Sequence, residues 1–521
     1  MSTETSLEQA RPGGARRWKQ LMVVSLIGLC ALFAGLVIKM AMTRSRQPPK
    51  NPGSIAAPIS SAEQQAMAEH LAAAVRIPTI SLSPLQKDAS AVARSAQAFT
   101  ALHAYLQSTF PLLHAALERE AIASDAAVPG QALLYTWRGS DGTLPPYLLA
   151  AHQDVVPVEP GTESRWQQPP FSGALVDGHI WGRGALDDKF SLIGIMEAIE
   201  RLIKSGYKPK RTLYIGSGHD EEVGGSGAQA ITARLAQRGV RVEFALDEGM
   251  ALVEGMLPGL SQPVALIGLA EKGSVTIEVA VRSQGGHSSM PPTQTAAGIL
   301  AAALTRLETH QLPVRLSGAP RLMFEHLAPE MPPALRLLMT NLWLFEPVLH
   351  WQLAQRPSTN ALVRTTTAIT MLEGSPKENV LPQRARAYVN FRILPGDSVQ
   401  AVLEHVRKTV ADPRVEVQIA GGRGNEPSTT SSADSPAFAR IAQSIRDHFP
   451  DAVVAPSLMI GASDVRHYAA VADNAYRFMP ILFRPDDLAR FHGTDERIAI
   501  ADFARVVAFY EHFIRQNDEA R

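Results

Sequence analysis

The sequence predicts an α/β protein whose mostly parallel sheet carries helices on both faces and is interrupted by an inserted ferredoxin-like α+β domain. Two observations lead to this fold class. Short apolar strands alternate with helical patterns up to about residue 270, which is typical of a parallel sheet. Beyond that point the order becomes β-α-β-β-α-β, the order of a ferredoxin-like unit. At 521 residues the chain also exceeds what one compact core holds.

The elements of the main sheet follow from hydrophobic periodicity. Helices are expected at 61–75, 96–109, 190–204 and 226–238, and again at 433–449 and 501–516. Strands are expected at 131–137, 146–151, 211–217 and 243–246. The interruption between the two helical groups predicts that one domain is split by an insert.

The insert is expected from alternating strands that enclose two helices. Its strands are expected at 274–282, 362–372, 384–393 and 414–420, and its helices at 294–308 and 398–411. Residues 319–355, which are dense in Leu, Met, Trp and Pro, predict a helical excursion within it. These patterns divide the chain into an N-terminal tail with an apolar segment (1–43), a linker (44–60), a main domain in two parts (61–269 and 426–521) and the insert (270–425).

An apolar segment near the N-terminus is long enough to cross a membrane as a helix, because residues 21–38 carry no charge. A signal peptide is the alternative, with Arg16, Arg17 and Lys19 as its basic region. No small-x-small cleavage site follows the apolar run, which favours an uncleaved membrane anchor. Basic residues flank both ends of the apolar segment, so the charges do not determine its orientation in the membrane. The short N-terminal tail favours an N-terminus on the cytoplasmic side. We expect the rest of the chain outside the cytoplasm, in a periplasm or lumen.

Composition excludes several classes of function. Fifty basic residues balance fifty acidic ones, and no basic run is long enough to follow a phosphate backbone, so no nucleic-acid partner is expected. Cys30, in the apolar segment, is the one cysteine. The rest of the chain therefore has no disulfide, no thiolate metal ligand and no cysteine nucleophile. Histidine and carboxylate side chains remain as the candidate metal ligands.

Acidic and imidazole side chains gather where the predicted strands end. The residues at these positions are His152, Asp154, Asp220, Glu221, Glu222, Asp247 and Glu248. Asp187 follows a tight Gly-Arg-Gly turn that leads into the helix at 190–204. Ligands of open α/β sheets bind at the carboxyl ends of strands, so these side chains are expected to meet. A carboxylate and histidine set without cysteine suits Zn²⁺ better than Mn²⁺ or Co²⁺.

Together with further motifs, this pattern resembles the two-zinc metallopeptidase family that includes aminoacylases, glutamate carboxypeptidase and carboxypeptidase S. The further motifs are Gly-His287-Ser-Ser, Ser-Thr-Asn360-Ala, Asn-Phe-Arg392-Ile and Arg-Phe-His492-Gly. Within the family, the sequence is most similar to the N-fatty-acyl-amino-acid synthase/hydrolase branch. The resemblance implies a zinc-exopeptidase-like fold in which the insert is a lid or dimerisation domain.

The resemblance also implies a centre that holds two Zn²⁺ per chain. The implied ligands are His152, Asp187, Glu222, Glu248 and His492. Asp187 bridges the two ions, Glu248 joins His152 at one of them, and the remaining two ligands belong to the other. Asp247 is the alternative to Glu248.

The other implied roles belong to residues around this centre. Asp154 accepts the second ring N–H of the histidine ligand, and Glu221 is the general base and then the general acid. His287 donates to the oxyanion, across a dimer interface in the family. Arg392 binds the substrate carboxylate as a bidentate fork, with Asn360 as a further polar contact.

Simpler explanations exist for two of these residues: His287 as an ordinary turn residue and Arg392 as half of a structural ion pair. The function expected is that of a zinc-dependent metallopeptidase or amidohydrolase, which cleaves N-acyl (including fatty-acyl) amino acids or C-terminal peptide bonds. The same site would also condense the free products. The alternative is a non-catalytic receptor or scaffold with this fold. That alternative predicts loss of Glu221 or Asp187, and both are present.

Overall fold

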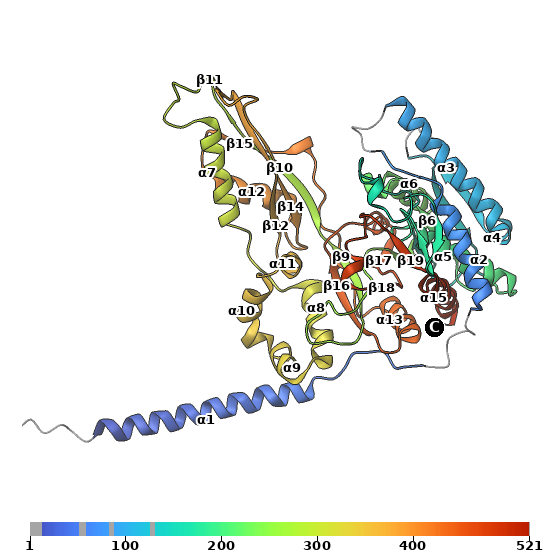
Figure 1. The fold of residues 1–521 in the computed structure, drawn as a ribbon. Coiled ribbons are helices and arrows are strands. Elements are labelled where there is room, and N and C mark those ends of the chain that lie inside the picture. The colour runs from blue at the N-terminus through green and yellow to red at the C-terminus, as the bar shows by residue number, and fades with distance from the viewer. Residues whose placement is uncertain (1–12, 52–58, 83–87, 125–130, 520–521) are drawn as a thin grey trace, which may run out of the picture.

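The computed structural model describes residues 13–51, 59–82, 88–124 and 131–519. Residues 52–58 of the predicted linker lie outside these ranges. The protein has a main domain, a second sheet that projects from it, a group of helices below that sheet, and a long N-terminal helix (Figure 1).

A ten-stranded sheet forms the centre of the main domain, in the order β1-β2-β6-β3-β7-β17-β9-β8-β18, with β16 paired to β9. The neighbours β6, β3, β7 and β17 are parallel to one another. Antiparallel pairs join β1 to β2, β2 to β6, β17 to β9 and β8 to β9. The predicted α/β class is confirmed, with a parallel centre and antiparallel additions.

The strands of this sheet are β1 (Glu118–Ile122), β2 (Ala132–Trp137), β3 (Tyr147–Ala150), β6 (Leu213–Ser217), β7 (Val242–Asp247), β8 (Leu252–Val253), β9 (Val264–Glu271), β16 (Val453–Met459), β17 (Ala472–Arg477) and β18 (Leu482–Phe483). A smaller sheet consists of β4 (Ala174–Val176), β5 (His179–Trp181) and β19 (Arg497–Ala499).

Helices cover both faces of the main sheet, as β2 illustrates. Leu133 and Tyr135 point into one core, and Ala132 and Leu134 point into another. This alternation is the period of two expected for a strand between two layers. One core is completed by α2 (Ser61–Val75), α3 (Ala89–Thr109), α4 (Pro111–Ala116), α5 (Lys189–Lys204), α13 (Pro436–His448) and α15 (Ile500–Glu519), and the other by α6 (Ser226–Gln237) and α14 (Val465–Tyr468).

The insert contains a four-stranded antiparallel sheet in the order β12-β14-β10-β15. Its elements are β10 (Gly273–Arg282), α7 (Ala296–Thr309), β12 (Thr366–Glu373), β14 (Arg384–Ile393), α12 (Val399–Val410) and β15 (Val415–Ile419). The two helices and one face of the sheet share a separate core. The chain therefore follows the β-α-β-β-α-β order that was expected from the sequence. A short ribbon of β11 (Gly286–His287) and β13 (Val380–Leu381) lies at the far tip (Figure 1).

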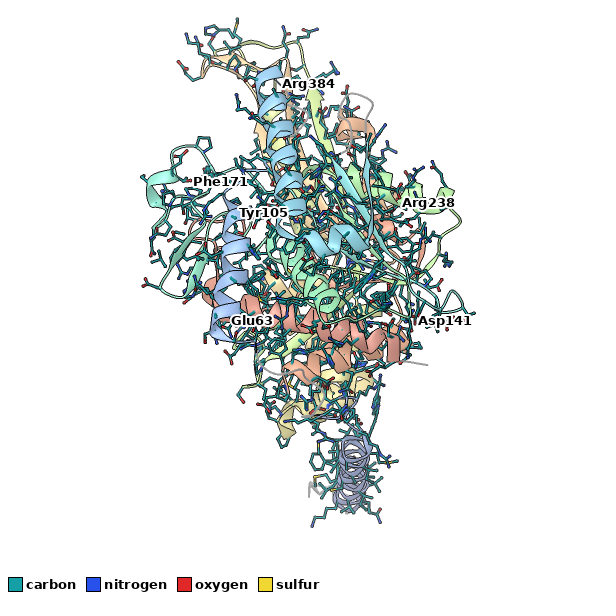
Figure 2. The ribbon with its side chains drawn as sticks, turned by 90° about the vertical axis from the view of Figure 1, so that its right-hand side faces the viewer. Glu63, Tyr105, Asp141, Phe171, Arg238 and Arg384 are labelled. Atoms are coloured by element: carbon teal, nitrogen blue, oxygen red, sulfur yellow. The ribbon has the colours of Figure 1, made fainter. Side chains whose placement is uncertain are left out.

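The excursion within the insert is helical, as predicted. It contains α8 (Gly318–Leu327), α9 (Pro333–Thr340), α10 (Leu342–Leu353) and α11 (Pro357–Val363). The expectation of a strand from residue 362 was wrong at its start, because residues 362 and 363 end α11 and β12 begins at Thr366. Figure 2, turned by 90°, places Arg384 at the insert end of the molecule and the N-terminal helix at the opposite end.

The N-terminal helix α1 (Gly13–Met42) extends away from the body (Figure 1). Its segment Trp18–Met42 contains an 18-residue window with a mean hydropathy of 2.8, and α1 is the one helix, among the residues that the structure describes, with the length and composition to cross a membrane. Residues 43–51 continue along the body: Gln47 exchanges two hydrogen bonds with the backbone of Val454, and Lys50 pairs with Asp451. This part of the predicted linker is therefore attached to the main domain.

Candidate metal centre and active site

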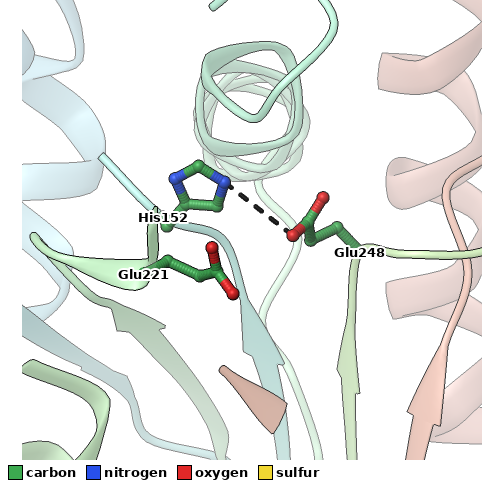
Figure 3. Close-up of side chains that lie close together, drawn as sticks. All are labelled: His152, Glu221 and Glu248. Atoms are coloured by element: carbon green, nitrogen blue, oxygen red, sulfur yellow. Dashed lines mark ion pairs between the residues drawn. The ribbon is translucent and has the colours of Figure 1, made fainter. Parts of the chain in front are cut away.

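Three neighbouring parallel strands end at the same edge of the main sheet. His152 follows β3 by two residues, Glu221 and Glu222 lie in a short 3₁₀ turn after β6, and Glu248 follows the last residue of β7. Because β3 lies between β6 and β7, the side chains after these strands converge. Figure 3 shows His152, Glu221 and Glu248 facing one another from three separate elements.

Asp187 lies between two imidazoles. Its Oδ1 is 2.8 Å from Nε2 of His152, and its Oδ2 is 2.7 Å from Nε2 of His492. Each carboxylate oxygen thus faces a different histidine, which is the arrangement required of a bridging ligand between two metal ions.

The two remaining predicted ligands lie one on each side of Asp187. Glu222 Oε1 is 3.2 Å from His492 Nε2, and Glu248 Oε1 is 3.8 Å from His152 Nε2. The structure therefore brings all five predicted ligands together in two groups that share Asp187. Asp247, the alternative to Glu248, is buried and has one carboxylate oxygen without a hydrogen bond among the described residues.

Asp154 positions both the histidine and the glutamates. Its Oδ1 lies 3.2 Å from Nδ1 of His152, and its two oxygens accept the backbone N–H groups of Glu221 and Glu222, each at 3.1 Å. The turn is also held by Asp220, which accepts the N–H groups of Ser226 and Gly227 at the start of α6. A buried carboxylate against the second ring nitrogen fixes the tautomer of a ligating imidazole.

The loop that carries Asp187 requires glycine at two positions. Gly182 and Gly184 have φ values of +139° and +94°. A Cβ on Gly182 would lie 2.5 Å from Val75 Cγ1, and one on Gly184 would lie 2.9 Å from Val155 Cγ1. The Gly-Arg-Gly turn seen in the sequence therefore reflects a left-handed backbone in a crowded place.

The sequence reasoning gave no role to Arg183 and Glu496, which hold this loop. The two side chains form a buried ion pair at 2.5 Å, and Glu496 Oε1 accepts the N–H groups of Gly184 and Leu186. Arg183 also donates to the carbonyl oxygen of His492. Asp188 was missed as well: its buried carboxylate accepts the backbone N–H of His152 at 3.2 Å. Arg183 and Asp188 lie in the segment of the Gly-Arg-Gly turn and Asp187, and Glu496 follows the His492 motif closely. This proximity to predicted site residues was the signal that could have identified them.

The cluster contains more carboxyl groups than its two imidazoles could neutralise as cations. Burial raises the pKa of Glu221 and of Glu248 well above the ordinary range. Hydrogen bonds to Asp187 and then to Glu222 raise the pKa of His492 to about 10. Burial alone would lower the pKa of His152, but its hydrogen bonds to Asp154 and Asp187 raise it overall. Burial alone would raise the pKa of Asp187, but its hydrogen bonds to His152 and His492 lower it. Glu221, Glu248 and the two imidazoles thus hold protons that cations would replace.

The donor set therefore fits divalent metal ions. It offers imidazole nitrogens and carboxylate oxygens without sulfur, a combination that zinc accepts. Two groups of potential ligands have atoms within 4.8 Å of one another: His152 with Glu221 and Glu248, and His152 with Asp187 and Glu222.

Two predicted substrate contacts lie where the insert meets the main domain. Arg392, near the end of β14, is exposed, and its side chain makes no ion pair or hydrogen bond within the described part of the chain. The simpler explanation of Arg392 as half of an ion pair is therefore not supported. Asn360, on α11, has a buried Oδ1 with no partner among the described residues. The charge of Arg392 also reaches Lys272, whose pKa is lowered to about 8 by burial and then by that charge.

His287 lies apart from the other predicted site residues. It belongs to β11, at the tip of the insert, and its imidazole contacts the hydroxyl of Ser289 at 2.7 Å. The side chain is exposed. Within one chain, therefore, the structure does not bring His287 to the metal ligands.

Comparison with known proteins places the chain in a family. Residues 148–516 match the model of peptidase family M20/M25/M40. The chain is 40% identical over 511 residues to the N-fatty-acyl-amino acid synthase/hydrolase PM20D1 of Xenopus tropicalis, covering 96% of each. It is 41% identical to the probable carboxypeptidase S-like 2 of Dictyostelium discoideum, covering 81% of this chain and 80% of the relative. Carboxypeptidase S of Saccharomyces cerevisiae is 32% identical, over 87% of this chain and 84% of the relative.

Solved structures with low sequence identity share the fold. The M20 family metallo-carboxypeptidase Sso-CP2 of Sulfolobus solfataricus superposes with a TM-score of 0.62 at 18% identity, covering 87% of this chain and 99% of that one. Human carnosine dipeptidase 1 has a TM-score of 0.59 at 17% identity, over 88% and 98% of the two chains.

The chain has histidine and carboxylate side chains at the strand ends of a parallel sheet, and its family relatives are metallopeptidases and amidohydrolases, so it is a hydrolase of that class. The chain belongs to peptidase family M20/M25/M40.

Proposed function

We propose that this chain is a two-zinc amidohydrolase that cleaves N-acyl amino acids, including fatty-acyl ones, or C-terminal peptide bonds, and that it also runs the reverse condensation. The observation that carries the proposal is Asp187, whose two oxygens each face a different histidine. The names of the relatives support the substrate class: one is an N-fatty-acyl-amino acid synthase/hydrolase and another is a carboxypeptidase S.

In this proposal His152, Asp187 and Glu248 would hold one zinc, and Asp187, Glu222 and His492 would hold the other. Zinc bound there would supply a more acidic water molecule and a polarised acyl carbonyl.

Glu221 acts as the general base. Its carboxylate is grouped with His152 and Glu248, a position from which it can accept a proton from water and then return it. Glu221 takes the proton of the attacking water and delivers it to the leaving nitrogen. Asp154 fixes the backbone of Glu221 and thereby the position of this carboxylate.

Recognition of the substrate carboxylate is assigned to Arg392, with Asn360 as the second polar contact. An unpaired guanidinium offers the two parallel donors that match a carboxylate. The buried Oδ1 of Asn360, which has no partner among the described residues, can accept a hydrogen bond from an N–H of the substrate. Substrates without the carboxylate would leave Arg392 uncompensated.

His287 is assigned to the oxyanion of a neighbouring active site. Because it lies exposed at the tip of the insert, it reaches such a site from a second copy of the chain. The insert is then a dimerisation domain as well as a lid. We also propose that α1 anchors the protein in a membrane, with the main domain outside the cytoplasm, in a periplasm or lumen.

One experiment tests the proposed function. Purified protein is analysed for metal and then assayed with N-acyl amino acids of short and long chain, their amides, and dipeptides. The proposal expects about two zinc per chain and turnover of the free acids. Bound metal without turnover of any member of the panel would favour the scaffold alternative.

A further inference from the structure

Helix α10 carries an exposed apolar stripe, defined by Trp343, Leu344, Pro347, Val348 and Trp351. The two tryptophans are 60% and 69% exposed, and Val348 is 54% exposed. The members are spaced by one, three or four residues, so they lie on one side of the helix. The opposite side is buried through Leu342, Leu349 and Leu353.

The stripe contains no charge, although α10 does carry charged and titratable groups. Glu346 lies beside the stripe and is paired with Arg321 and with His350. These pairs leave the stripe itself as an uncharged surface with a tryptophan at each end. Contiguous exposed apolar surface of this kind marks an interaction site in a soluble or membrane-associated protein.

The start of α10 is fastened to the apolar helix α1. Nδ2 of Asn341, the residue before α10, donates to the carbonyl oxygen of Leu36 at 3.2 Å, and Leu36 is buried. Arg336 of α9 donates to the carbonyl oxygen of Thr43 at 2.9 Å. These bonds hold α9 and the residue before α10 against the last turns of α1, and Figure 1 shows α9 beside that end of α1.

The position of this contact along α1 sets the depth of α10. Leu36 lies within the uncharged run 21–38, and Lys39 follows it closely. At about 1.5 Å per residue, the run from residue 21 to residue 38 is about 26 Å long, close to the thickness of a bilayer hydrocarbon core. The start of α10 is therefore level with the end of the apolar run, where hydrocarbon gives way to headgroups.

We propose that the α10 stripe lies in the interfacial layer of the same bilayer that α1 crosses, so that the protein contacts lipid through two elements. Tryptophan is enriched at this level, because its ring is apolar and its N–H is polar. Exposed Trp18, at the other end of the apolar run, occupies the opposite interface. The inference rests on the proposed membrane anchoring by α1, but not on the proposed hydrolase activity.

The test uses the full chain in lipid vesicles, and its single cysteine makes site-specific spin labelling simple. Native Cys30, exposed on α1, reports the anchor. The variant Cys30→Ser/Val348→Cys reports the stripe, and Cys30→Ser/Gln400→Cys, on exposed α12, is the matched aqueous control. Electron paramagnetic resonance then compares the access of oxygen, which enters lipid, with that of a water-soluble nickel chelate.

The proposal expects the labels at 30 and 348 to meet oxygen more than nickel, and the label at 400 to show the reverse. A label at 348 that behaves like the one at 400, with Cys30 still shielded from nickel, would overturn the inference and leave the anchor intact. Nickel access at Cys30 would overturn the anchor and the inference with it. Spin–spin broadening at 348 that disappears on dilution with unlabelled chain would show that a second copy covers the stripe.

Discussion

The guanidinium of Arg183 holds the backbone of His492, a residue 309 positions later in the chain, through a hydrogen bond of 3.0 Å from Nη2 to the carbonyl oxygen. His492 has a φ of +59°, which residues other than glycine seldom adopt. Its side chain is 46% exposed, so packing alone does not fix it. The bond therefore links the loop of Asp187 to His492, a proposed metal ligand on a strained and partly exposed turn.

Replacing Arg183 by lysine should weaken the site that contains His492. Lysine keeps the charge but cannot donate at once to Glu496 and to the carbonyl oxygens of His492 and Gly493. We expect zinc to fall from about two per chain toward one, with a loss of about 1–3 kcal/mol in the free energy of unfolding. Metal analysis and urea denaturation measure both. The control is Arg138→Lys, whose exposed pair with Glu118 should matter little. Unchanged affinity for both zinc ions would refute the role of Arg183.

The adjacent glutamates should separate catalysis from metal binding. Glu221→Gln should leave the metal content intact and lower kcat by about 100-fold or more, because a general base is lost. Glu222→Gln should instead lower metal occupancy, since its carboxylate lies against His492. Elemental analysis and steady-state kinetics on both variants decide the matter. The opposite pattern would exchange the two roles.

The bridging role of Asp187 predicts an effect on both metals. Asp187→Asn removes one of the two oxygens that face the histidines, so we expect at most one zinc per chain and no measurable hydrolysis. In the unaltered protein, a chelator should abolish activity and added zinc should restore it. Two tightly held zinc ions in Asp187→Asn would contradict a bridge.

Arg392 should determine whether a free carboxylate is required. A charge-assisted bidentate pair contributes roughly 1.5–3 kcal/mol, so Arg392→Ala should reduce the preference for an N-acyl amino acid over its amide by about tenfold or more. The measurement is kcat/KM for an acid and an amide with the same acyl chain. The matched control is Arg386→Ala, because Arg386 is on the same strand but is paired with Glu373. It should leave the preference for the acid unchanged. If the unaltered enzyme turns over the acid and the amide equally, Arg392 does not bind the substrate carboxylate.

A buried histidine far from the metal centre predicts how stability depends on pH. Burial lowers the pKa of His448 from its ordinary value of 6.5 to about 4. The unfolded chain therefore takes up a proton before the folded one, so stability is complete above pH 6.5 and falls as the pH drops toward 4. Each proton contributes a slope of up to about 1.4 kcal/mol per pH unit. Urea denaturation at several pH values should show a flatter slope for His448→Gln than for the unaltered chain. Equal slopes would show that His448 titrates normally.

The sequence was sufficient for the features that depend on local pattern. The strands β3, β6 and β7 are short apolar runs with polar residues at their ends, so their bounds and the convergence of His152, Glu222 and Glu248 could be predicted. The order of the insert followed from the same alternation. The assignment of these side chains as metal ligands remains a prediction.

Features that depend on distant pairing could not be read from one sequence. Strand β9 was not predicted, whereas β10, which follows it after Lys272, was predicted at 274–282. The partnership of Arg183 with Glu496 joins positions 313 apart, and no local pattern reveals which buried charges meet. The placement of His287 at the tip of the insert likewise depends on tertiary structure.

The attachment of Gln47 to Val454 limits how the main domain can rotate relative to α1. A flexible linker after α1 would let the main domain rotate freely, so that its active site could face any direction. Here the chain leaving α1 is bound within a few residues, by Gln47 to β16 and by Lys50 to Asp451. The main domain therefore keeps a set orientation relative to the axis of α1. In the proposed membrane anchoring, lateral diffusion of the whole molecule, and not rotation of its domain, would then determine which substrates it encounters.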